Sequence, residues 1–277
     1  GAHVDVERYF AHALSPSRVV PARDGAVQAL TVSLDYRTDA IAVWRQSGAL
    51  WARELPGRGG ARPTQRLATV DPAPRITALI SDDGRAMVAW ADERAGSTSV
   101  YLDYSGPRVR FGRPRLLERF ADPAGVPYPA RSPLLVRLST ESVMLAWTGA
   151  QADHWVVRTA AIDFNGIGRA STISDPQGEA LLSDLQPGPD GEAIALWTEP
   201  QPVSGGGLSL ARQAVAAARG GDGHPDATYF GEPEQIAPPG PNADATLALD
   251  PDGGRALALW RGAGGAIEYA IRGSASR

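Results

Sequence analysis

Four aspartates next to apolar segments carry the clearest acid–base potential of the sequence. Asp24, Asp71, Asp184 and Asp244 each lie just before an apolar run or at its start. Two carboxyl groups held about 5–9.5 Å apart could cleave a glycosidic bond, one as acid and the other as base or nucleophile. No motif fixes which aspartate would take which role, and Asp is also common in turns because its side chain hydrogen-bonds the backbone. These four residues are the candidate catalytic residues, with ordinary turn aspartates as the alternative.

A second group of residues suits ligand binding. Its members are arginine, aspartate, histidine and tryptophan side chains near the ends of apolar segments, a mixture typical of carbohydrate or protein contacts. The candidate ligand-binding residues are Arg75, Arg131, Asp92, Arg94, His154 and Trp155. Trp155, like Trp51, could stack on a sugar ring, although core packing is the more common role of a tryptophan.

Several other chemistries lack the residues they need. The 277-residue chain has no cysteine, which excludes disulfides, thiolate metal sites and cysteine nucleophiles. Its 4 histidines are scattered without metal-ligand spacing. The sequence contains no Walker loop, dinucleotide fingerprint or Gly-x-Ser-x-Gly elbow. We therefore expect no metal and no cofactor.

Charge and hydropathy limit the possible partners. The 27 basic residues, all of them arginine, are outnumbered by 31 acidic ones, for a net charge of −4. A dedicated nucleic-acid binder usually shows a basic surplus. No apolar run approaches the roughly 20 residues of a membrane-spanning helix. We expect neither a nucleic-acid partner nor membrane insertion.

A repeat organises the elements that must position these side chains. Five segments share a run of small and branched apolar residues that ends in tryptophan: AIAVW (40–44), AMVAW (86–90), VMLAW (143–147), AIALW (193–197) and ALALW (256–260). Their tryptophans are 46, 57, 50 and 63 residues apart. In each unit an apolar run and a turn, often Asp-Gly, precede the tryptophan segment, and two progressively more polar segments follow it.

Four strands of declining hydrophobicity in about 50 residues are typical of a propeller blade. The repeat predicts an all-β, five-bladed β-propeller with four-stranded antiparallel blades at residues 26–70, 74–120, 132–174, 180–237 and 244–272. The last unit has three strands, and we expect the N-terminal segment 6–20 to supply its fourth, which would remove an open sheet edge. We also expect each tryptophan to end its strand and to fill the space between blades.

The repeat resembles those of exported bacterial β-propellers of the actinobacterial type. The shared features are the apolar run, Asp-Gly, the small-apolar segment ending in Trp, and Phe-Gly-x-Pro, as at 111–114 and 230–233. The third unit departs from this pattern, with Ser139-Thr140-Glu141-Ser142 in place of Asp-Gly. The resemblance implies an extracellular or cell-surface location.

Propeller geometry would bring the candidate residues together. Loops that lead into the first strand of each blade lie on the same face as loops that join its second and third strands. On that face we also expect Glu179, Arg45, Glu93, Asp153, Glu199 and Arg261. Five-bladed glycosidases resembling arabinanases place acidic residues at this opening.

We expect a non-catalytic binding or interaction module whose ligand is a glycan or a cell-surface protein, because variable loops on a repeated scaffold usually carry recognition. The first alternative is a glycoside hydrolase or lyase that uses the axial carboxylates. The second is a scaffold domain of a larger surface protein.

Overall fold

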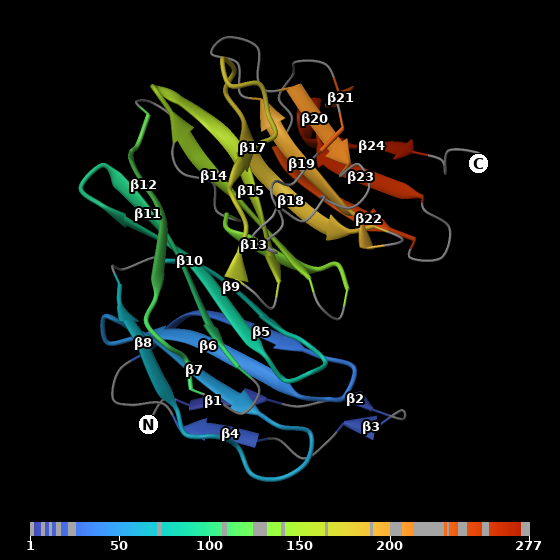
Figure 1. Cartoon of the computed structure of the whole chain (residues 1–277). Helices are drawn as coiled ribbons and strands as arrows, with labels where there is room; N and C mark the ends of the chain where they lie inside the picture. The colour runs from blue at the N-terminus through green and yellow to red at the C-terminus, as the bar shows by residue number, and fades with distance from the viewer. Residues whose placement is uncertain are drawn as a thin grey trace. The chain divides into compact units, whose positions relative to one another are not determined.

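The computed structural model describes residues 3–6, 9–10, 13–14, 18–21, 26–70, 74–106, 110–123, 132–139, 142–163, 166–188, 191–199, 207–212, 230–231, 233–237, 243–250 and 255–272. The chain divides into two compact units, Gly1–Arg119 and Phe120–Arg277, and each is described by itself. The described residues form antiparallel sheets and contain no α-helix (Figure 1).

The first unit holds two four-stranded antiparallel sheets, each with its strands paired in chain order. The strands of the first sheet are β5 (Val27–Leu34), β6 (Ala40–Gln46), β7 (Ala49–Leu55) and β8 (Gln65–Thr69). Those of the second sheet are β9 (Arg75–Ile80), β10 (Ala86–Arg94), β11 (Ser97–Ser105) and β12 (Arg115–Ala121). Both sheets therefore have the strand order predicted for a propeller blade.

The second unit holds three more antiparallel sheets. The third sheet contains β13 (Leu134–Arg137), β14 (Val143–Gln151), β15 (His154–Asp163), β16 (Gly166–Ile167) and β17 (Ser171–Thr172). The fourth contains β18 (Leu181–Pro187), β19 (Ala193–Glu199), β20 (Gly207–Arg212) and β21 (Glu234–Ala237). The fifth contains β22 (Ala243–Leu249), β23 (Ala256–Arg261) and β24 (Ile267–Arg272), with the 3-10 turn η2 (Ala263–Gly265) between the last two strands.

The N-terminal strands differ from the prediction that they would complete the fifth sheet. Instead, β1 (His3–Val6) pairs with β4 (Arg18–Pro21), and β2 (Tyr9–Phe10) pairs with β3 (Ala13–Leu14). The fifth sheet has three strands among the residues that the structure describes. Pairing between nearby segments closes short loops and costs little chain entropy. Among the described residues, the N-terminal strands therefore pair locally, and the predicted fourth strand of the last sheet is not shown.

The two sheets of the first unit pack face to face. Ile41 and Val43 of β6 share a buried cluster with Val88 and Trp90 of β10. Phe111, which opens the Phe-Gly-x-Pro motif, is buried in the same cluster. The motif thus places an aromatic ring between two sheets before β12 begins.

Sheets in the second unit pack in the same way. Ala146 of β14 shares a buried cluster with Trp197 of β19. On the opposite face of β19, Leu196 shares a second cluster with Trp260 of β23. The fourth sheet is therefore covered on both faces, which explains the continuous apolar sequence of its second strand.

The repeated tryptophans are buried in all five sheets, at most 5% exposed: Trp44, Trp90, Trp147, Trp197 and Trp260. Trp90, Trp197 and Trp260 each lie in a cluster with the sheet that precedes their own in the chain. For these three residues the predicted packing between neighbouring sheets is confirmed.

The tryptophan does not end its strand, contrary to expectation. β10 runs four residues past Trp90, and Asp92 and Arg94 pair with Ser99 and Ser97 of β11. The turn between these strands is only Ala95-Gly96, with φ of 49° and 73°. Positive φ at both central residues is typical of a tight type I′ hairpin, which lets pairing continue up to the turn. The variable loop expected after Trp90 is therefore strand and hairpin.

Burial declines outward from the second strand of each sheet. All seven residues of β6 are buried, whereas β12 is largely exposed. β5 departs from the predicted gradient, because Leu30, Val32 and Leu34 are about half exposed. These three residues lie opposite Trp44, Ala42 and Ala40, on the face of the first sheet that points away from the second.

Candidate ligand-binding pocket

A pocket of about 580 Å³ lies between the first and second sheets, within the first unit. One side is formed by β8, and the other by β10, β11, β12 and Pro114. Its volume falls within the range of about 300–1,000 Å³ that is usual for small-molecule sites. Two of the three predicted ligand-binding residues of this sheet edge, Asp92 and Arg94, line it.

Two stacked aromatic rings form the floor of the pocket. Trp90 and Tyr101 are cross-strand partners, and their rings stack with centroids 5.3 Å apart and an interplanar angle of 18°. Trp90 is 1% exposed, while Tyr101 is half-buried. Tyr101 is therefore the ring that a ligand can contact, and Trp90 stacks against it from the neighbouring strand.

Arg94 and Asp92 form an ion pair on the rim. Nε and Nη2 of Arg94 lie 3.0 and 2.9 Å from Oδ2 of Asp92. Nη2 of Arg94 also donates to the carbonyl oxygen of Thr69, at 3.2 Å, and so joins β10 to the end of β8. Asp92 is 6% exposed and Arg94 53% exposed, so the guanidinium covers the carboxylate and faces solvent.

Arg119 lines the same side of the pocket from β12, across β11 from Arg94. Its Nε donates to Oγ of Ser99 on β11, at 2.9 Å. Because Ser97, Ser99 and Tyr101 alternate along β11, their side chains share the face that lines the pocket. Hydroxyl, guanidinium and aromatic groups therefore converge on one hollow.

Sequence reasoning missed Arg119, Ser99 and Tyr101. The alternation of Ser97, Ser99 and Tyr101 was the available signal, because a period of two places these side chains on one face of a strand. Arg119 lies in the outermost strand of its sheet, and nothing in its local sequence distinguishes it from other exposed arginines.

The remaining predicted residue of this edge, Arg75, lies close to the hairpin as expected. Its Nη2 is 3.6 Å from Oε1 of Glu93. Asp71, Asp24 and Arg131 lie outside the described residues. In the second sheet, the start of β9 therefore lies beside the hairpin that joins β10 to β11, as predicted.

His154 begins β15 and lies between two carboxylates. Nε2 is 3.2 Å from Oδ1 of Asp153, and Nδ1 is 3.4 Å from Oε1 of Glu179. Oε2 of Glu179 accepts the backbone N–H of Trp155, at 3.0 Å. This small cluster lies in the second unit and ties the segment before β18 to β15.

Trp155 is fully buried, which corrects its expected role as a sugar-stacking residue. Its ring packs edge-on against Phe120, with centroids 5.7 Å apart and planes at 85°. A side chain with no exposed face cannot stack on a ligand. Core packing, the alternative stated for this residue, is what the structure shows.

Asp184 is a structural carboxylate. Oδ1 accepts the N–H of Leu185 and Nε2 of Gln186, at 2.8 and 3.2 Å. Oδ2 accepts hydrogen bonds from the Oγ1 hydroxyl of Thr246 and from the N–H of Leu247, at 2.8 and 2.7 Å. The two hydrogen bonds to Oδ2 join β18 to β22, and Asp184 is 8% exposed. These contacts occupy both oxygens that a catalytic role would need.

Asp244, the fourth catalytic candidate, forms an exposed ion pair. Nε and Nη2 of Arg261 lie 3.0 and 2.9 Å from its Oδ2. Asp244 has φ of 53° at an irregularity in β22, a conformation that Asp tolerates better than most residues. As expected, a residue at the start of the first strand of this sheet meets a residue at the end of the second strand. Here, however, the pair is a carboxylate and a guanidinium group rather than two carboxyl groups.

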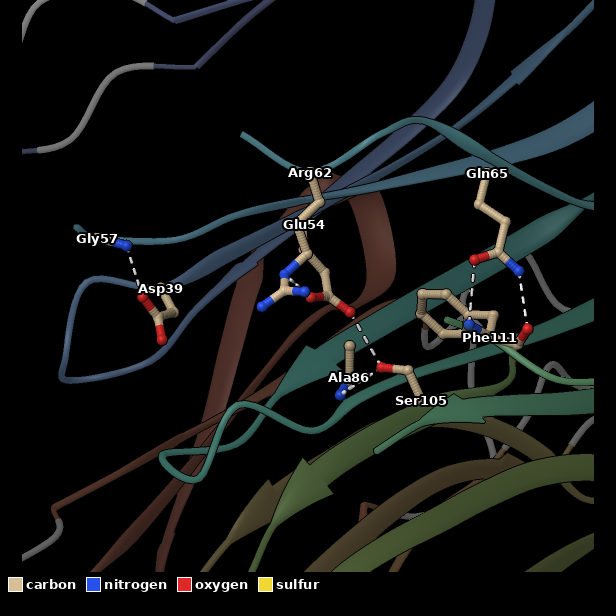
Figure 2. A network of polar contacts seen from close by, with 8 residues as sticks. All are labelled: Asp39, Glu54, Gly57, Arg62, Gln65, Ala86, Ser105 and Phe111. Atoms are coloured by element: carbon tan, nitrogen blue, oxygen red, sulfur yellow. Dashed lines mark hydrogen bonds and ion pairs between the residues drawn. The ribbon is translucent and has the colours of Figure 1, made fainter. Parts of the chain in front are cut away.

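A smaller pocket of about 170 Å³ lies between the same two sheets, beside the network in Figure 2. Glu54 of β7 binds Nε of Arg62 at 2.9 Å and accepts Oγ of Ser105 of β11 at 3.0 Å. Gln65 of β8 forms hydrogen bonds with both backbone groups of Phe111. Its Nε2 donates to the carbonyl oxygen at 2.8 Å, and its Oε1 accepts from the N–H at 3.1 Å. These contacts fasten the two sheets together.

Two carboxyl groups near this network have raised pKa values. Burial raises the pKa of Glu54, opposed by the Ser105 hydrogen bond and the charge of Arg62. Burial also raises the pKa of Asp103 to about 6, opposed by backbone hydrogen bonds from Tyr104 and Gly112. Asp103 lies on the same face of β11 as Tyr101 and Ser105, and is 2% exposed.

The described residues contain no cluster suited to a metal ion and no helix suited to a membrane. No group of three or more His, Cys, Asp or Glu side chains there is arranged to hold a metal ion. Over the same residues, no helix has the length and apolar character needed to cross a membrane.

Comparison with known proteins bears on the fold. No family profile matches the sequence, and no curated protein does. A structural study of two prolyl endopeptidases gives a match with TM-score 0.50 and 14% identity, over 96% of this chain and 38% of that one. This chain has a β-propeller-like fold.

Two further matches are weaker. The polysaccharide lyase Uly1 matches with TM-score 0.45 and 11% identity, over 89% of this chain and 58% of that one. A subtype N11 neuraminidase-like protein of A/flat-faced bat/Peru/033/2010 matches with TM-score 0.40 and 11% identity, over 97% of this chain and 91% of that one. The propeller-like chain thus spans well under two thirds of the endopeptidase and of the lyase.

Proposed function

We propose that this chain is a non-catalytic, extracytoplasmic binding module that holds a saccharide in the pocket between its first and second sheets. The observation that carries the proposal is the half-buried ring of Tyr101, stacked on Trp90 and surrounded by Arg94, Arg119 and Ser97. Sugar rings have an apolar face and a polar edge, so an aromatic floor with a polar rim matches both.

The position of the pocket refines the expected site. We expected recognition at the axial opening, whereas this pocket lies between two adjacent sheets and is built mainly from strands. A rigid aromatic pocket between blades is the arrangement expected of a lectin rather than of a glycosidase, because the latter needs two cooperating carboxyl groups. Among the described residues that line the pocket, the one carboxylate is Asp92, and it is paired with Arg94.

A glycan array followed by titration calorimetry on the best ligands tests this proposal. Tyr101→Ala removes the ring that a sugar would cover, and we expect about a 5- to 150-fold loss of affinity, since such stacking is worth about 1–3 kcal/mol. Tyr104→Ala is the matched control, because Tyr104 lies on the opposite face of β11 and is 43% exposed. Equal affinities for both variants would contradict the assignment of the pocket.

A hydrolysis and elimination assay on the same polysaccharides addresses the alternative function. We expect binding without release of reducing ends or unsaturated products. Turnover would replace the binding module with a glycoside hydrolase or lyase. Binding to a cell-surface protein but to no glycan would favour the other ligand class.

We further propose that the five sheets are the blades of one five-bladed propeller. Sheets that follow one another in each unit pack face to face, and the repeated tryptophan lies on the face toward the preceding sheet. In a closed ring every sheet has a neighbour on both faces. The half-exposed apolar face of β5 and the exposed Ile267, Tyr269 and Ile271 of β24 are the faces that such neighbours would cover.

The extracellular or cell-surface location is part of the same proposal. Its support is the resemblance of the Trp and Phe-Gly-x-Pro repeats to those of exported bacterial propellers. Localising the native protein in its source cells, by fractionation and antibody detection, is the direct test.

A further inference from the structure

The charges in the pocket are unbalanced. Arg94 and Arg119 supply two guanidinium groups, and Asp92 supplies one carboxylate. Because Asp92 pairs with Arg94 through two contacts of 2.9 and 3.0 Å, the positive charge that remains belongs to Arg119.

Arg119 is held in place by a neutral group. Its Nε donates to Oγ of Ser99, which fixes one edge of the guanidinium. In the part of the chain that the structure describes, no carboxylate lies within 4.0 Å of its nitrogen atoms. The two terminal nitrogens, Nη1 and Nη2, therefore remain as a planar fork, the geometry that binds a carboxylate through two parallel hydrogen bonds.

We propose that the saccharide bound here is acidic, and that Arg119 binds its carboxylate while Tyr101 contacts the sugar ring. This inference rests on the proposed binding function of the same pocket. Arg119 is thereby the residue that determines specificity for charged over neutral sugars, and Ser99 positions it.

Titration calorimetry with three saccharides of matched length tests the inference: an oligogalacturonate, a neutral galacto-oligosaccharide and a sulfated galacto-oligosaccharide. For the wild-type chain we expect the oligogalacturonate to bind most tightly, with an affinity that falls as salt rises. For Arg119→Gln we expect an affinity about 10- to 100-fold lower for the oligogalacturonate, as for loss of a charge-assisted hydrogen-bonded pair. Affinity for the neutral sugar should change less than about 2-fold, within the range of a substitution that leaves the ring contact intact.

Two further variants test whether the effect depends on the planar guanidinium of Arg119 or only on the total charge of the chain. Arg119→Lys keeps the charge but loses the fork, so its affinity should fall between those of the wild type and Arg119→Gln. Arg115→Gln removes the same charge from the same strand, and Arg115 does not line the pocket. Equal losses in Arg115→Gln and Arg119→Gln would reduce the effect to net charge and overturn the inference.

The outcomes distinguish this inference from the function on which it rests. If neutral and acidic sugars bind equally, with loss in Tyr101→Ala but none in Arg119→Gln, the acidic specificity is wrong and the binding pocket stands. Preference for the sulfated sugar over the oligogalacturonate would also overturn the carboxylated-sugar assignment. If no saccharide binds the wild type, both the function and the inference fail.

Discussion

Among the described carboxyl groups of the first unit, Asp103 has the most strongly raised pKa. It lies on β11 between Tyr101 and Ser105, is 2% exposed, and its Oδ2 has no hydrogen-bond partner among the described residues. Burial disfavours the charged form, which is why its pKa rises from 3.8 to about 6. A charge that forms near neutral pH between two packed sheets should be visible in the stability of the unit.

Asp103→Asn should flatten the pH dependence of stability. Because the folded pKa lies above the unfolded one, the folded state holds more protons between pH 3.8 and about 6. The free energy of unfolding of the wild type therefore falls as pH rises through this window, by about 3 kcal/mol at most. Urea denaturation at pH 4.5, 5.5 and 7.5 should show a shallower fall in the variant.

The matched control for this measurement is Asp175→Asn, whose side chain is exposed and accepts a backbone N–H, and which should keep the wild-type slope. The raised pKa of Glu54 acts in the same direction and remains in both variants. An unchanged slope in Asp103→Asn would mean that this carboxyl is not the group that titrates.

Asp184→Ala should destabilise the second unit because Asp184 joins the fourth and fifth sheets. The substitution leaves the buried N–H groups of Leu185 and Leu247 without their acceptor. We expect a loss of about 2–4 kcal/mol in the free energy of unfolding, measured by urea denaturation. Asp244→Ala removes an exposed ion pair and should cost less than about 1 kcal/mol. Comparable losses in the two variants would contradict the structural role of Asp184.

At the scale of elements, the tryptophan segment is the most constant part of each sheet. Trp197 is fully buried between β19 and the third sheet, and its Nε1 donates to Oε1 of Glu199 at 3.1 Å. The ring thus contributes both apolar burial and a satisfied polar group to sheet packing.

Trp197→Ala should cost about 3–5 kcal/mol of unfolding free energy, as for a large aromatic side chain removed from a packed core. Trp51→Ala is the control from outside the repeat position, because Trp51 is half-buried and should cost less. Thermal and urea denaturation of both variants provide the measurement. A smaller loss at Trp197 than at Trp51 would show that the repeat position does not dominate sheet packing.

Much of this level could be predicted from sequence, and the exceptions have physical causes. The apolar period and the tryptophan spacing correctly located the sheets, because the apolar residues that a strand buries are contiguous or alternate within its own segment. The type I′ turn at Ala95-Gly96 was missed because Ala is an unusual residue at positive φ, so Asp92 and Arg94 were placed in a loop. Trp155 was misassigned because its burial depends on Phe120, which lies 35 positions earlier in the chain.

The site was harder to predict than the sheets. Asp92 and Arg94 were identified from their position near a strand end, and both line the pocket. Arg119 and Leu67 reach the same hollow from strands more than 20 residues away on either side, and only the packing of two sheets brings them together. Sequence period predicts which face a residue occupies, but not which faces meet.

At the scale of the whole molecule, the first and fifth sheets each carry exposed apolar side chains on one face. Val32 of β5 is 47% exposed and Tyr269 of β24 is 66% exposed, each in a row of alternating apolar residues. Isolated exposed apolar residues are ordinary, but rows on one sheet face indicate a surface meant to be buried.

Val32→Asp measures whether the outer face of the first sheet is covered in solution. If the proposed ring closes, the carboxylate becomes buried without a partner, and we expect a loss of at least about 3 kcal/mol in urea denaturation. Leu116→Asp on the outer strand β12, 49% exposed, should stay within about 0.5 kcal/mol of the wild type. Matching small effects at both positions would argue against a closed propeller.

The floor and rim of the pocket belong to four hydrogen-bonded strands, with Pro114 as the one contribution from a connecting segment. Side chains mounted on paired strands keep their positions when no ligand is present, so little protein freedom is lost when one arrives. Recognition on such a support can change by single replacements at alternate strand positions, without any loop being rebuilt. The same rigidity has a disadvantage: if a guanidinium group is misplaced here, the paired strands cannot shift to restore its position.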